Sequence, residues 1–218
     1  MTKFLKKEWP FLLLLLLPLI AAIIIYPYMP EMVPTHWNTR GEVDGYSSKE
    51  FGTFFLPLLN IGLYVLFIVL PLLDPKKENY EKFLGSYRLI RYVTHIFFVF
   101  MFIITTLAAL GYTLDIGLWI ACGAAMLFIL MGNIMGRVRH NYFVGFRYPW
   151  TLANEEVWRK THQMGSKVMV LGGILALIGV IFTQDNIRFI VLMAGLFIPT
   201  IFTTIYSYLT FKKVTKKQ

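Results

Sequence analysis

The chain alternates long apolar stretches with short polar connections. A helix rises about 1.5 Å per residue and the hydrocarbon core of a bilayer is about 30 Å thick, so a spanning helix needs roughly 20 mostly apolar residues. Six stretches have this length, and they are continuous rather than alternating as barrel strands are. They cover residues 10–28, 51–73, 89–111, 116–135, 164–182 and 189–211. The pattern predicts an all-α, polytopic membrane helical bundle with six transmembrane helices.

The distribution of basic residues predicts the orientation of this bundle. Three of the connections between stretches contain only Arg40, Lys49 and Arg188. The two ends of the chain, the other connections and the first turns of the spans that follow them contain Lys3, Lys6, Lys7, Lys76, Lys77, Lys82, Arg88, Arg91, Arg137, Arg139, Arg147, Arg159, Lys160, Lys167, Lys212, Lys213, Lys216 and Lys217. Because lysine and arginine concentrate in cytoplasmic loops, we predict both termini in the cytoplasm (N-in/C-in) of a multi-pass protein of the cell membrane.

Composition supports a membrane protein and excludes several other classes. Hydrophobic residues make up 57% of the chain and charged residues only 15%, which a soluble domain does not show. The net charge of +9 does not indicate nucleic-acid binding, because the basic residues lie at helix ends, where membrane lipid headgroups account for them. The first stretch is too long for a cleavable signal peptide, so we expect it to remain attached. The lone Cys122 excludes an internal disulfide and a cysteine-based metal site.

The longest predicted outer connection, residues 29–50, contains turn-forming residues. Pro34, Asn38, Gly41 and the pair Asp44-Gly45 favour an ordered loop that folds against the helix ends. Trp37 lies in the same segment and could supply a large contact surface to a ligand.

His36 of this segment is accompanied by Glu31, Glu42 and Asp44. These side chains could form a metal site, an acid–base pair of a membrane hydrolase, or a structural hydrogen-bond network. The sequence does not give the distances that would decide between these alternatives.

The inner segment, residues 137–165, is the most distinctive part of the chain. Pro149 disfavours a helix before it, and Thr151 or Asn154 is suited to cap a helix that follows. The four-residue spacings of Glu155 with Arg159 and of Glu156 with Lys160 then favour ion pairs on that helix. We predict a short amphipathic cytoplasmic helix that leads into the fifth span, with Trp150 and Trp158 at the level of the headgroups.

This inner segment could be an interfacial anchor, a binding surface, or both. Arg147 is suited to bridge backbone carbonyls or a carboxylate, and its simplest partner in the chain is Glu155 or Glu156. In the binding interpretation, Trp158 and His162 lie on the exposed face of the helix.

Small and polar residues within the spans suggest how the helices pack. Rows of small residues at four-residue spacing allow close approach of helices, and we expect packing within one bundle rather than dimerisation. These rows are Gly117, Ala121 and Ala125; Gly132 and Gly136; and Gly172 and Ala176. The polar residues Asn60, His95 and Asn133 at membrane depth are expected to face the bundle interior.

Two motifs resemble the SdpI family, bacterial membrane proteins associated with immunity to the SDP-type toxic peptide. Pro34 to Asn38, with Gly41 and Asp44, is similar to the element DUF1648. The second motif is Asn141-Tyr142-Phe143-Val144-Gly145-Phe146-Arg147, followed by Pro149 to Leu152 and by Val157 to His162, with Asp74 to Asn79 in addition. We expect a DUF1648-like half over residues 1–85 with two spans and an SdpI-like half over residues 86–218 with four.

The resemblance implies a non-enzymatic immunity protein without a cofactor, which engages an antimicrobial peptide toxin. In the characterised branch of the family it also implies recruitment of a cytoplasmic transcriptional repressor. Candidate ligand-binding residues are His36, Trp37, Asn38 and Asp44. Candidate residues of the cytoplasmic signature are Asn141, Gly145, Arg147, Pro149, Trp150, Asn154, Glu155, Trp158 and His162. A small-molecule or lipid transporter or flippase is the alternative, and a membrane-embedded hydrolase is a third possibility.

Overall fold

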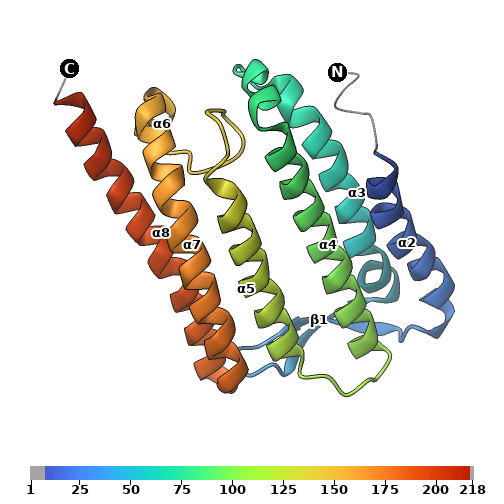
Figure 1. Cartoon of the computed structure of the whole chain (residues 1–218). Helices are drawn as coiled ribbons and strands as arrows, with labels where there is room; N and C mark the ends of the chain where they lie inside the picture. Colours follow the sequence, from blue (N-terminus) through green and yellow to red (C-terminus); the bar gives the residue numbers. More distant parts are fainter. Residues whose placement is uncertain (1–7, 217–218) are drawn as a thin grey trace.

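The computed structural model describes residues 8–216 and consists mainly of long helices that run side by side (Figure 1). In this part of the chain, six helical segments are long and apolar enough to cross a membrane. The helices are α2 (Trp9–Ile25), α3 (Lys49–Leu73), α4 (Leu84–Ala109), α5 (Ile116–Met135), α6 (Pro149–Ala153), α7 (Glu155–Phe182) and α8 (Asp185–Thr215). Short 3-10 helices η1 (Tyr26–Tyr28) and η2 (Lys77–Phe83) adjoin α2 and α4. The predicted six-helix membrane bundle is confirmed.

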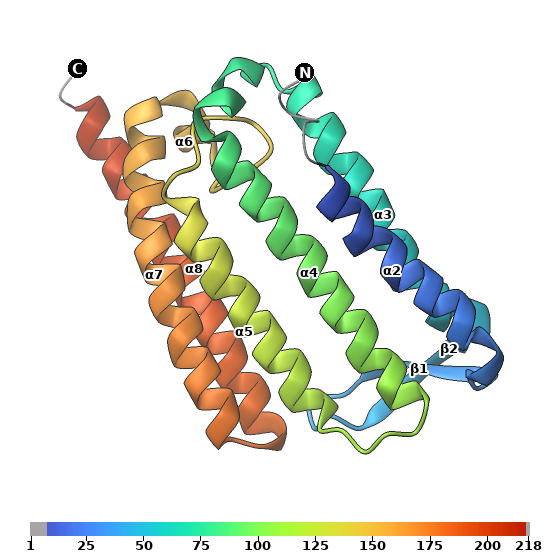
Figure 2. The ribbon, with the colours of Figure 1, turned by 45° about the vertical axis from the view of Figure 1, so that its right-hand side comes forward.

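The helices form two groups that meet chiefly where α4 packs against α5. Helices α2, α3 and α4 pack against one another, and α7 packs extensively against both α5 and α8. The contact of α4 with α5 joins the N-terminal group (α2–α4) to the C-terminal group (α5–α8) (Figure 2). The assignment of residues 1–85 and 86–218 to two halves concerns the sequence and stays a prediction.

Helix α7 is longer than the fifth predicted span. The sequence places a separate amphipathic helix before a span that begins at Met164, but α7 is continuous from Glu155 to Phe182. Asn154 caps it, because its side-chain oxygen accepts from the backbone N–H groups of Glu156 (2.9 Å) and Val157 (3.1 Å). The predicted amphipathic turn is therefore the first part of the spanning helix itself.

The predicted ordered loop at residues 29–50 is a β-hairpin. Strand β1 (Met32–Trp37) pairs antiparallel with β2 (Val43–Ser48), and the register shifts between Pro34 and His36 and again between His36 and Trp37. Proline cannot donate to the ladder, so an irregular register near Pro34 is expected. The hairpin lies across one end of the bundle, which we call the hairpin end (Figure 1).

The opposite end, which we call the loop end, contains η2 and residues 136–148. Helix α2 begins and α8 ends here, as six crossings require (Figure 1). Which end faces the cytoplasm stays a prediction, and Lys3, Lys6, Lys7 and Lys217, on which it partly depends, lie outside the described residues.

Small residues pack helices closely, as predicted. A Cβ atom added to Gly132 of α5 would lie 2.8 Å from the Cβ of Met169 in α7. One added to Gly172 of α7 would lie 2.2 Å from Pro199 Cγ in α8. Ala176 is 1% exposed and approaches Gly195 of α8. Backbone contact in this C-terminal group therefore depends on residues without bulky side chains.

The polar residues at membrane depth divide between the interior and the surface. His95 is fully buried, and its Nδ1 lies 2.7 Å from Oδ1 of the buried Asn60, as predicted for interior polar groups. Asn133 is exposed instead, so the prediction was wrong for this residue. It lies between the buried Gly132 and Ile134 on α5, and the face that packs against α7 includes Gly132 but not Asn133.

Candidate functional site

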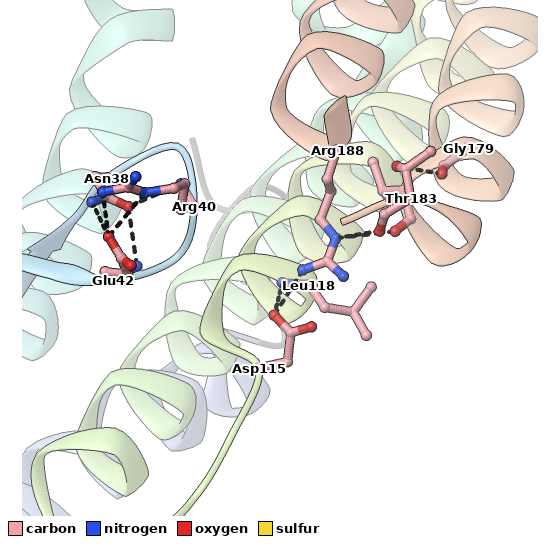
Figure 3. A network of polar contacts seen from close by, with 9 residues as sticks. Asn38, Arg40, Glu42, Asp115, Leu118, Gly179, Thr183 and Arg188 are labelled. Atoms are coloured by element: carbon pink, nitrogen blue, oxygen red, sulfur yellow. Dashed lines mark hydrogen bonds and ion pairs between the residues drawn. The ribbon is translucent and has the colours of Figure 1, made fainter. Parts of the chain in front are cut away.

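The turn of the hairpin is held by Asn38. Its Oδ1 accepts from the backbone N–H groups of Arg40 (2.9 Å) and Glu42 (3.1 Å), and its Nδ2 donates to Glu42 Oε2 at 2.9 Å. Arg40 Nε also donates to this oxygen at 3.0 Å (Figure 3). These contacts lower the pKa of Glu42, chiefly through the hydrogen bond from Asn38 and then through the charge of Arg40. Asn38, a candidate ligand-binding residue, thus uses its amide to fold the turn.

His36 and Asp44 face each other across the two strands. Nδ1 of His36 lies 2.5 Å from Oδ1 of Asp44, and the two side chains are 72% and 44% exposed. Two of the four residues singled out in the sequence are therefore brought together. No group of three or more potential metal-ligating side chains is found among residues 8–216. Because both side chains are exposed, the pair can offer a hydrogen bond or a negative charge to a ligand that approaches from solvent.

The tip of the hairpin contacts the C-terminal group of helices. Thr39 donates a hydrogen bond to Asn186 at the start of α8. Gly41 has a φ of +80°, and a Cβ atom there would lie 3.4 Å from the backbone nitrogen of Gly117 in α5. The base of the hairpin adjoins the N-terminal group, because a Cβ atom added to Gly52 of α3 would lie 2.4 Å from Val33 Cβ in β1. The hairpin therefore connects the two groups of helices.

An ion pair beside this contact holds the starts of α5 and α8 together. Arg188 Nη1 donates to Asp115 Oδ1 at 2.7 Å, and Arg188 Nε donates to the carbonyl of Thr183 at 3.0 Å (Figure 3). Asp115 also caps α5 by accepting from the N–H of Leu118 at 2.9 Å. Partial burial acts to raise the pKa of Asp115, but the hydrogen bonds from Arg188 and Leu118 and the charge of Arg188 outweigh it and lower the pKa. The sequence analysis did not select this pair.

A cavity of about 330 Å³ lies between the hairpin and the adjoining helices. His36 and Trp37 line it from β1, Phe51 and Phe55 line it from α3, Met101 contributes from α4 and Ile120 from α5. Trp37 is half-buried. Two candidate ligand-binding residues, His36 and Trp37, thus border a cavity, whereas Asp44 reaches it only through its contact with His36.

Buried hydrogen bonds of Asp74 organise the loop end. Asp74 is 2% exposed. Its Oδ2 accepts from the Tyr142 N–H (2.9 Å) and the Tyr80 hydroxyl (3.1 Å), and its Oδ1 accepts from the Lys76 N–H (2.7 Å). Because Tyr142 belongs to residues 136–148, Asp74 joins the end of α3 to the loop between α5 and α6. Asp74 appears in the sequence motif, but its burial and its role as an acceptor for three groups could not be inferred there.

His140 makes a second connection at the loop end. Lys76 Nζ lies 2.8 Å from His140 Nδ1, and Asn79 Nδ2 donates to the carbonyl of His140 at 2.9 Å. Burial, followed by the nearby charge of Lys76, lowers the pKa of His140. The ring is therefore neutral at pH 7 and accepts from the lysine. Sequence reasoning missed His140, because a lone histidine in a basic segment gives no signal of burial.

Asn141 of the candidate signature folds its own loop. Its Nδ2 donates to the carbonyls of Arg139 (2.8 Å) and Val144 (2.9 Å), and its Oδ1 accepts from the N–H groups of Phe143 (2.9 Å) and Val144 (2.7 Å). The residue is fully buried. An unsatisfied buried amide would be costly, so these bonds make Asn141 a structural requirement of the loop.

Gly145 allows His162 to approach the loop. Gly145 has a φ of +120°, and a Cβ atom there would lie 2.2 Å from Nε2 of His162. That nitrogen accepts from the Phe146 N–H at 3.0 Å, so Nδ1 carries the proton and donates to the carbonyl of Trp158 at 2.9 Å. His162 therefore holds residues 145–146 against α7.

Trp158 and His162 are buried, which contradicts the prediction that they lie on an exposed face. Their exposed fractions are 2% and 1%, and their rings stack with centroids 4.0 Å apart. Trp158 Nε1 donates to the carbonyl of Val138 at 3.1 Å. The loop of residues 136–148 covers this face of α7, which the periodicity of α7 alone could not reveal. The prediction that Trp158 lies at the level of the headgroups stays a prediction, because burial under the loop does not give its depth in the bilayer.

Arg147 remains exposed, and its Nη1 donates to the carbonyl of Tyr142 at 3.2 Å. This agrees with the prediction that Arg147 contacts a backbone carbonyl. The bond from Nη1 goes to Tyr142 and not to Glu155 or Glu156, which were suggested as partners. Glu156 instead pairs with Lys160 at 2.7 Å, as predicted. Glu155 is exposed in the first turn of α7.

The short helix α6 fastens the loop to α8. Pro149 is its first residue and is exposed. Trp150 Nε1 donates to Ser207 Oγ at 2.8 Å, and the Trp150 ring stacks on Tyr148 at 5.4 Å. The Tyr148 and Thr204 hydroxyls are 2.6 Å apart. Trp150 is thus a half-buried contact between α6 and α8.

These features define a multi-pass helical protein of the cell membrane with a β-hairpin at one end and a densely hydrogen-bonded loop at the other. Residues 137–207 match the SdpI/YfhL protein family, and residues 13–61 match DUF1648, a domain of unknown function. The protein named "Immunity protein SdpI" from Bacillus subtilis (strain 168) is 29% identical over 209 residues, which cover 96% of this chain and 98% of that protein. The resemblance to the SdpI family is thereby confirmed. No solved structure matches the chain.

Proposed function

We propose that this protein is a membrane immunity protein that gives resistance to a secreted antimicrobial peptide. The observation that carries the proposal is the similarity to Immunity protein SdpI over 96% of the chain, which includes both the hairpin and the loop end. In the proposed orientation the hairpin end faces outward. His36, Trp37 and Asp44 then meet the toxin first, while Asn38 keeps the turn in shape.

Toxin challenge of a host with and without the gene tests this proposal. We expect survival only with the gene, and a loss of protection in the variant Trp37→Ala/Asp44→Ala at unchanged protein level. A matched control is Tyr112→Ala, since Tyr112 is also exposed at the hairpin end but lies in the connection between α4 and α5. Equal survival with and without the gene would refute immunity.

We also propose that the protein acts without catalysis. A histidine–carboxylate pair such as His36–Asp44 could in principle transfer a proton. Preorganised catalytic groups gain most of their effect in water-excluded sites, however, and these side chains are 72% and 44% exposed. A surface pair of this kind is better suited to binding than to hydrolysis.

A second part of the proposal is recruitment of a cytoplasmic transcriptional repressor to the loop end. The exposed side chains Tyr142, Arg147 and Glu155 surround a buried framework, so they can be changed without loss of the fold. In cells with a fluorescently labelled repressor, Arg147→Ala/Glu155→Ala should release the label from the membrane while toxin survival is retained. Unchanged recruitment would contradict this role. Direct contact with nucleic acid is not part of the proposal, and the exposed basic residues at this end other than Arg147 are assigned to lipid headgroups.

A transporter or flippase is the alternative, and one observation favours it. The N-terminal group contains buried polar residues along its axis, namely the Glu8–Arg91 ion pair and the Asn60–His95 hydrogen bond. Ionisable residues inside membrane helices are often part of a pathway. If protection depends on transport, His95→Phe should abolish it in a protein that remains folded and inserted. Full protection by a folded His95→Phe variant would leave the polar residues with a structural role.

A further inference from the structure

The cavity beneath the hairpin combines apolar walls with a polar rim. Phe51 and Phe55 stack with ring centroids 4.7 Å apart and are 49% and 45% exposed. Met101 and Ile120 complete the wall from α4 and α5. Aromatic and aliphatic walls of this kind favour apolar side chains, whose burial contributes about 25 cal/mol for each Å² removed from water.

The rim of the cavity belongs to the hairpin. His36 and Trp37 of β1 both border it, and Asp44 contacts His36 from β2. A tryptophan next to a hydrogen-bonding pair can contact apolar groups with its ring and polar groups with its N–H. The volume of about 330 Å³ falls within the lower range of ligand sites, which extends from about 300 to 1,000 Å³.

Charge at the hairpin end has the opposite sign to the charge of the whole chain. The chain carries +9, yet residues 29–50, 112–115 and 183–188, which join the predicted spans at this end, contain six acidic and only three basic residues. The acidic residues are Glu31, Glu42, Asp44 and Glu50 in and around the hairpin, Asp115 before α5, and Asp185 at the start of α8. Such a surface attracts cations and repels anions, so it is complementary to a peptide with basic residues.

We propose that this cavity receives apolar side chains of a cationic, membrane-active peptide while the peptide's basic residues lie against the acidic hairpin end. The inference rests on the proposed immunity function and adds the chemical class of the peptide and the place where it binds. An apolar wall selects the hydrophobic part of the ligand, and the acidic surroundings select its charge. A lipid acyl chain would satisfy the wall but would show no preference for positive charge.

The test uses the full chain, with Cys122 unchanged, in vesicles of zwitterionic lipid, so that any charge preference comes from the protein. A photo-crosslinking amino acid replaces either Met101, which lines the cavity, or Ile103, which is 47% exposed on another face of the same helix. The probes are two synthetic peptides with the same leucine- and phenylalanine-rich core, one ending in three lysines and the other in three glutamates.

We expect the lysine peptide to label position 101 at least fivefold more than position 103, and at least fivefold more than the glutamate peptide does. The variant Glu31→Gln/Asp44→Asn should reduce labelling at 101 severalfold. The control Glu78→Gln/Glu81→Gln removes two exposed acids at the loop end and should leave labelling unchanged.

Equal labelling at 101 and 103, or equal labelling by both peptides, would overturn the inference and indicate partition into lipid. Survival under toxin challenge is measured separately. If the gene protects cells but charge-selective labelling is absent, only the cavity inference fails. If the gene gives no protection, the proposed function fails whatever the labelling shows.

Discussion

Arg91 places its guanidinium against both carboxylate oxygens of Glu8, with Nη1–Oε1 at 3.1 Å and Nη2–Oε2 at 2.6 Å. The two side chains are 1% and 11% exposed. Tyr64 donates to the same carboxylate at 3.2 Å, and the centroid of the Phe11 ring lies 4.2 Å from the Arg91 guanidinium carbon. Helices α2, α3 and α4 therefore meet at one buried ion pair near the loop end.

Breaking this ion pair should destabilise the protein more than replacing both partners. Arg91→Met leaves the Glu8 carboxylate buried without its counter-ion, a change that costs about 3–5 kcal/mol in comparable pairs. We expect thermal unfolding in detergent to occur at a clearly lower temperature in Arg91→Met, and the double variant Glu8→Gln/Arg91→Met to recover a substantial part of the loss. A double variant less stable than Arg91→Met would contradict this account.

Gly145 should not tolerate a side chain. Its φ of +120° strains any L-residue, and the added Cβ would meet His162 Nε2. Gly145→Ala should lower the free energy of unfolding by about 1–3 kcal/mol or more. Gly62→Ala is the matched control, because no atom lies within 4 Å of its added Cβ in α3, and it should be neutral or stabilising by about 0.5–1 kcal/mol. Similar losses in both variants would argue against a special role of the loop.

His162 and Arg147 should separate stability from surface function. His162→Ala removes the acceptor of the Phe146 N–H and should cost about 1–3 kcal/mol, with loss of all outputs that need the folded loop. Arg147→Ala changes an exposed residue and should stay within about 0.5 kcal/mol of the native protein. Denaturation in detergent measures both. The distinction fails if Arg147→Ala is the less stable of the two.

The Asp115–Arg188 pair predicts a dependence of stability on pH. Because folding lowers the pKa of Asp115, its contribution is complete above the ordinary pKa of the carboxyl group and is lost as the pH falls through the lower, folded value. Below about pH 4 the native protein should therefore lose stability more steeply than Asp115→Asn. Asp185→Asn is the control, because it removes an exposed carboxylate at the same end of the molecule. The substitution should not strain the backbone, since asparagine readily adopts the φ of +50° found at this position. Parallel pH curves for native protein and Asp115→Asn would disprove the assignment.

Cysteine labelling tests the predicted orientation. With Cys122 replaced by alanine, Thr39→Cys should react with an impermeant thiol reagent in intact cells. Glu78→Cys, exposed at the loop end, should react only after permeabilisation. The reverse pattern would place the hairpin in the cytoplasm.

The spans could be predicted from the sequence because a bilayer sets the length of an apolar helix. Five of the six spanning α-helices begin within about five residues of the predicted starts of their spans, if the 3-10 helices η1 and η2 are not counted. The Asn154 cap also follows a local rule. The hairpin was expected only as an ordered loop, because Met32–Trp37 contains Pro34 and shows no regular alternation of apolar and polar residues.

Contacts between distant segments could not be predicted in this way. Arg91 was counted with the basic residues that predict orientation, but its partner Glu8 is 83 residues away. Trp158 and His162 were expected to be exposed, because nothing in α7 itself shows that residues 136–148 fold over it. The cavity depends on β1, α3, α4 and α5 together. Of its lining residues, only Pro34 to Trp37 belong to a local motif, and only His36 and Trp37 of these were proposed as ligand-binding residues.

The contact of the hairpin tip with α8 also has a consequence for biogenesis. Thr39 and Asn186 are separated by 147 positions. At about 5–20 residues per second, a ribosome needs roughly 7–30 s to synthesise the intervening chain. During that interval the hairpin has already been made, while its partner on α8 does not yet exist. The hairpin end is therefore completed only after the last helix is inserted, and a chain that stops before α8 leaves Thr39 without this contact.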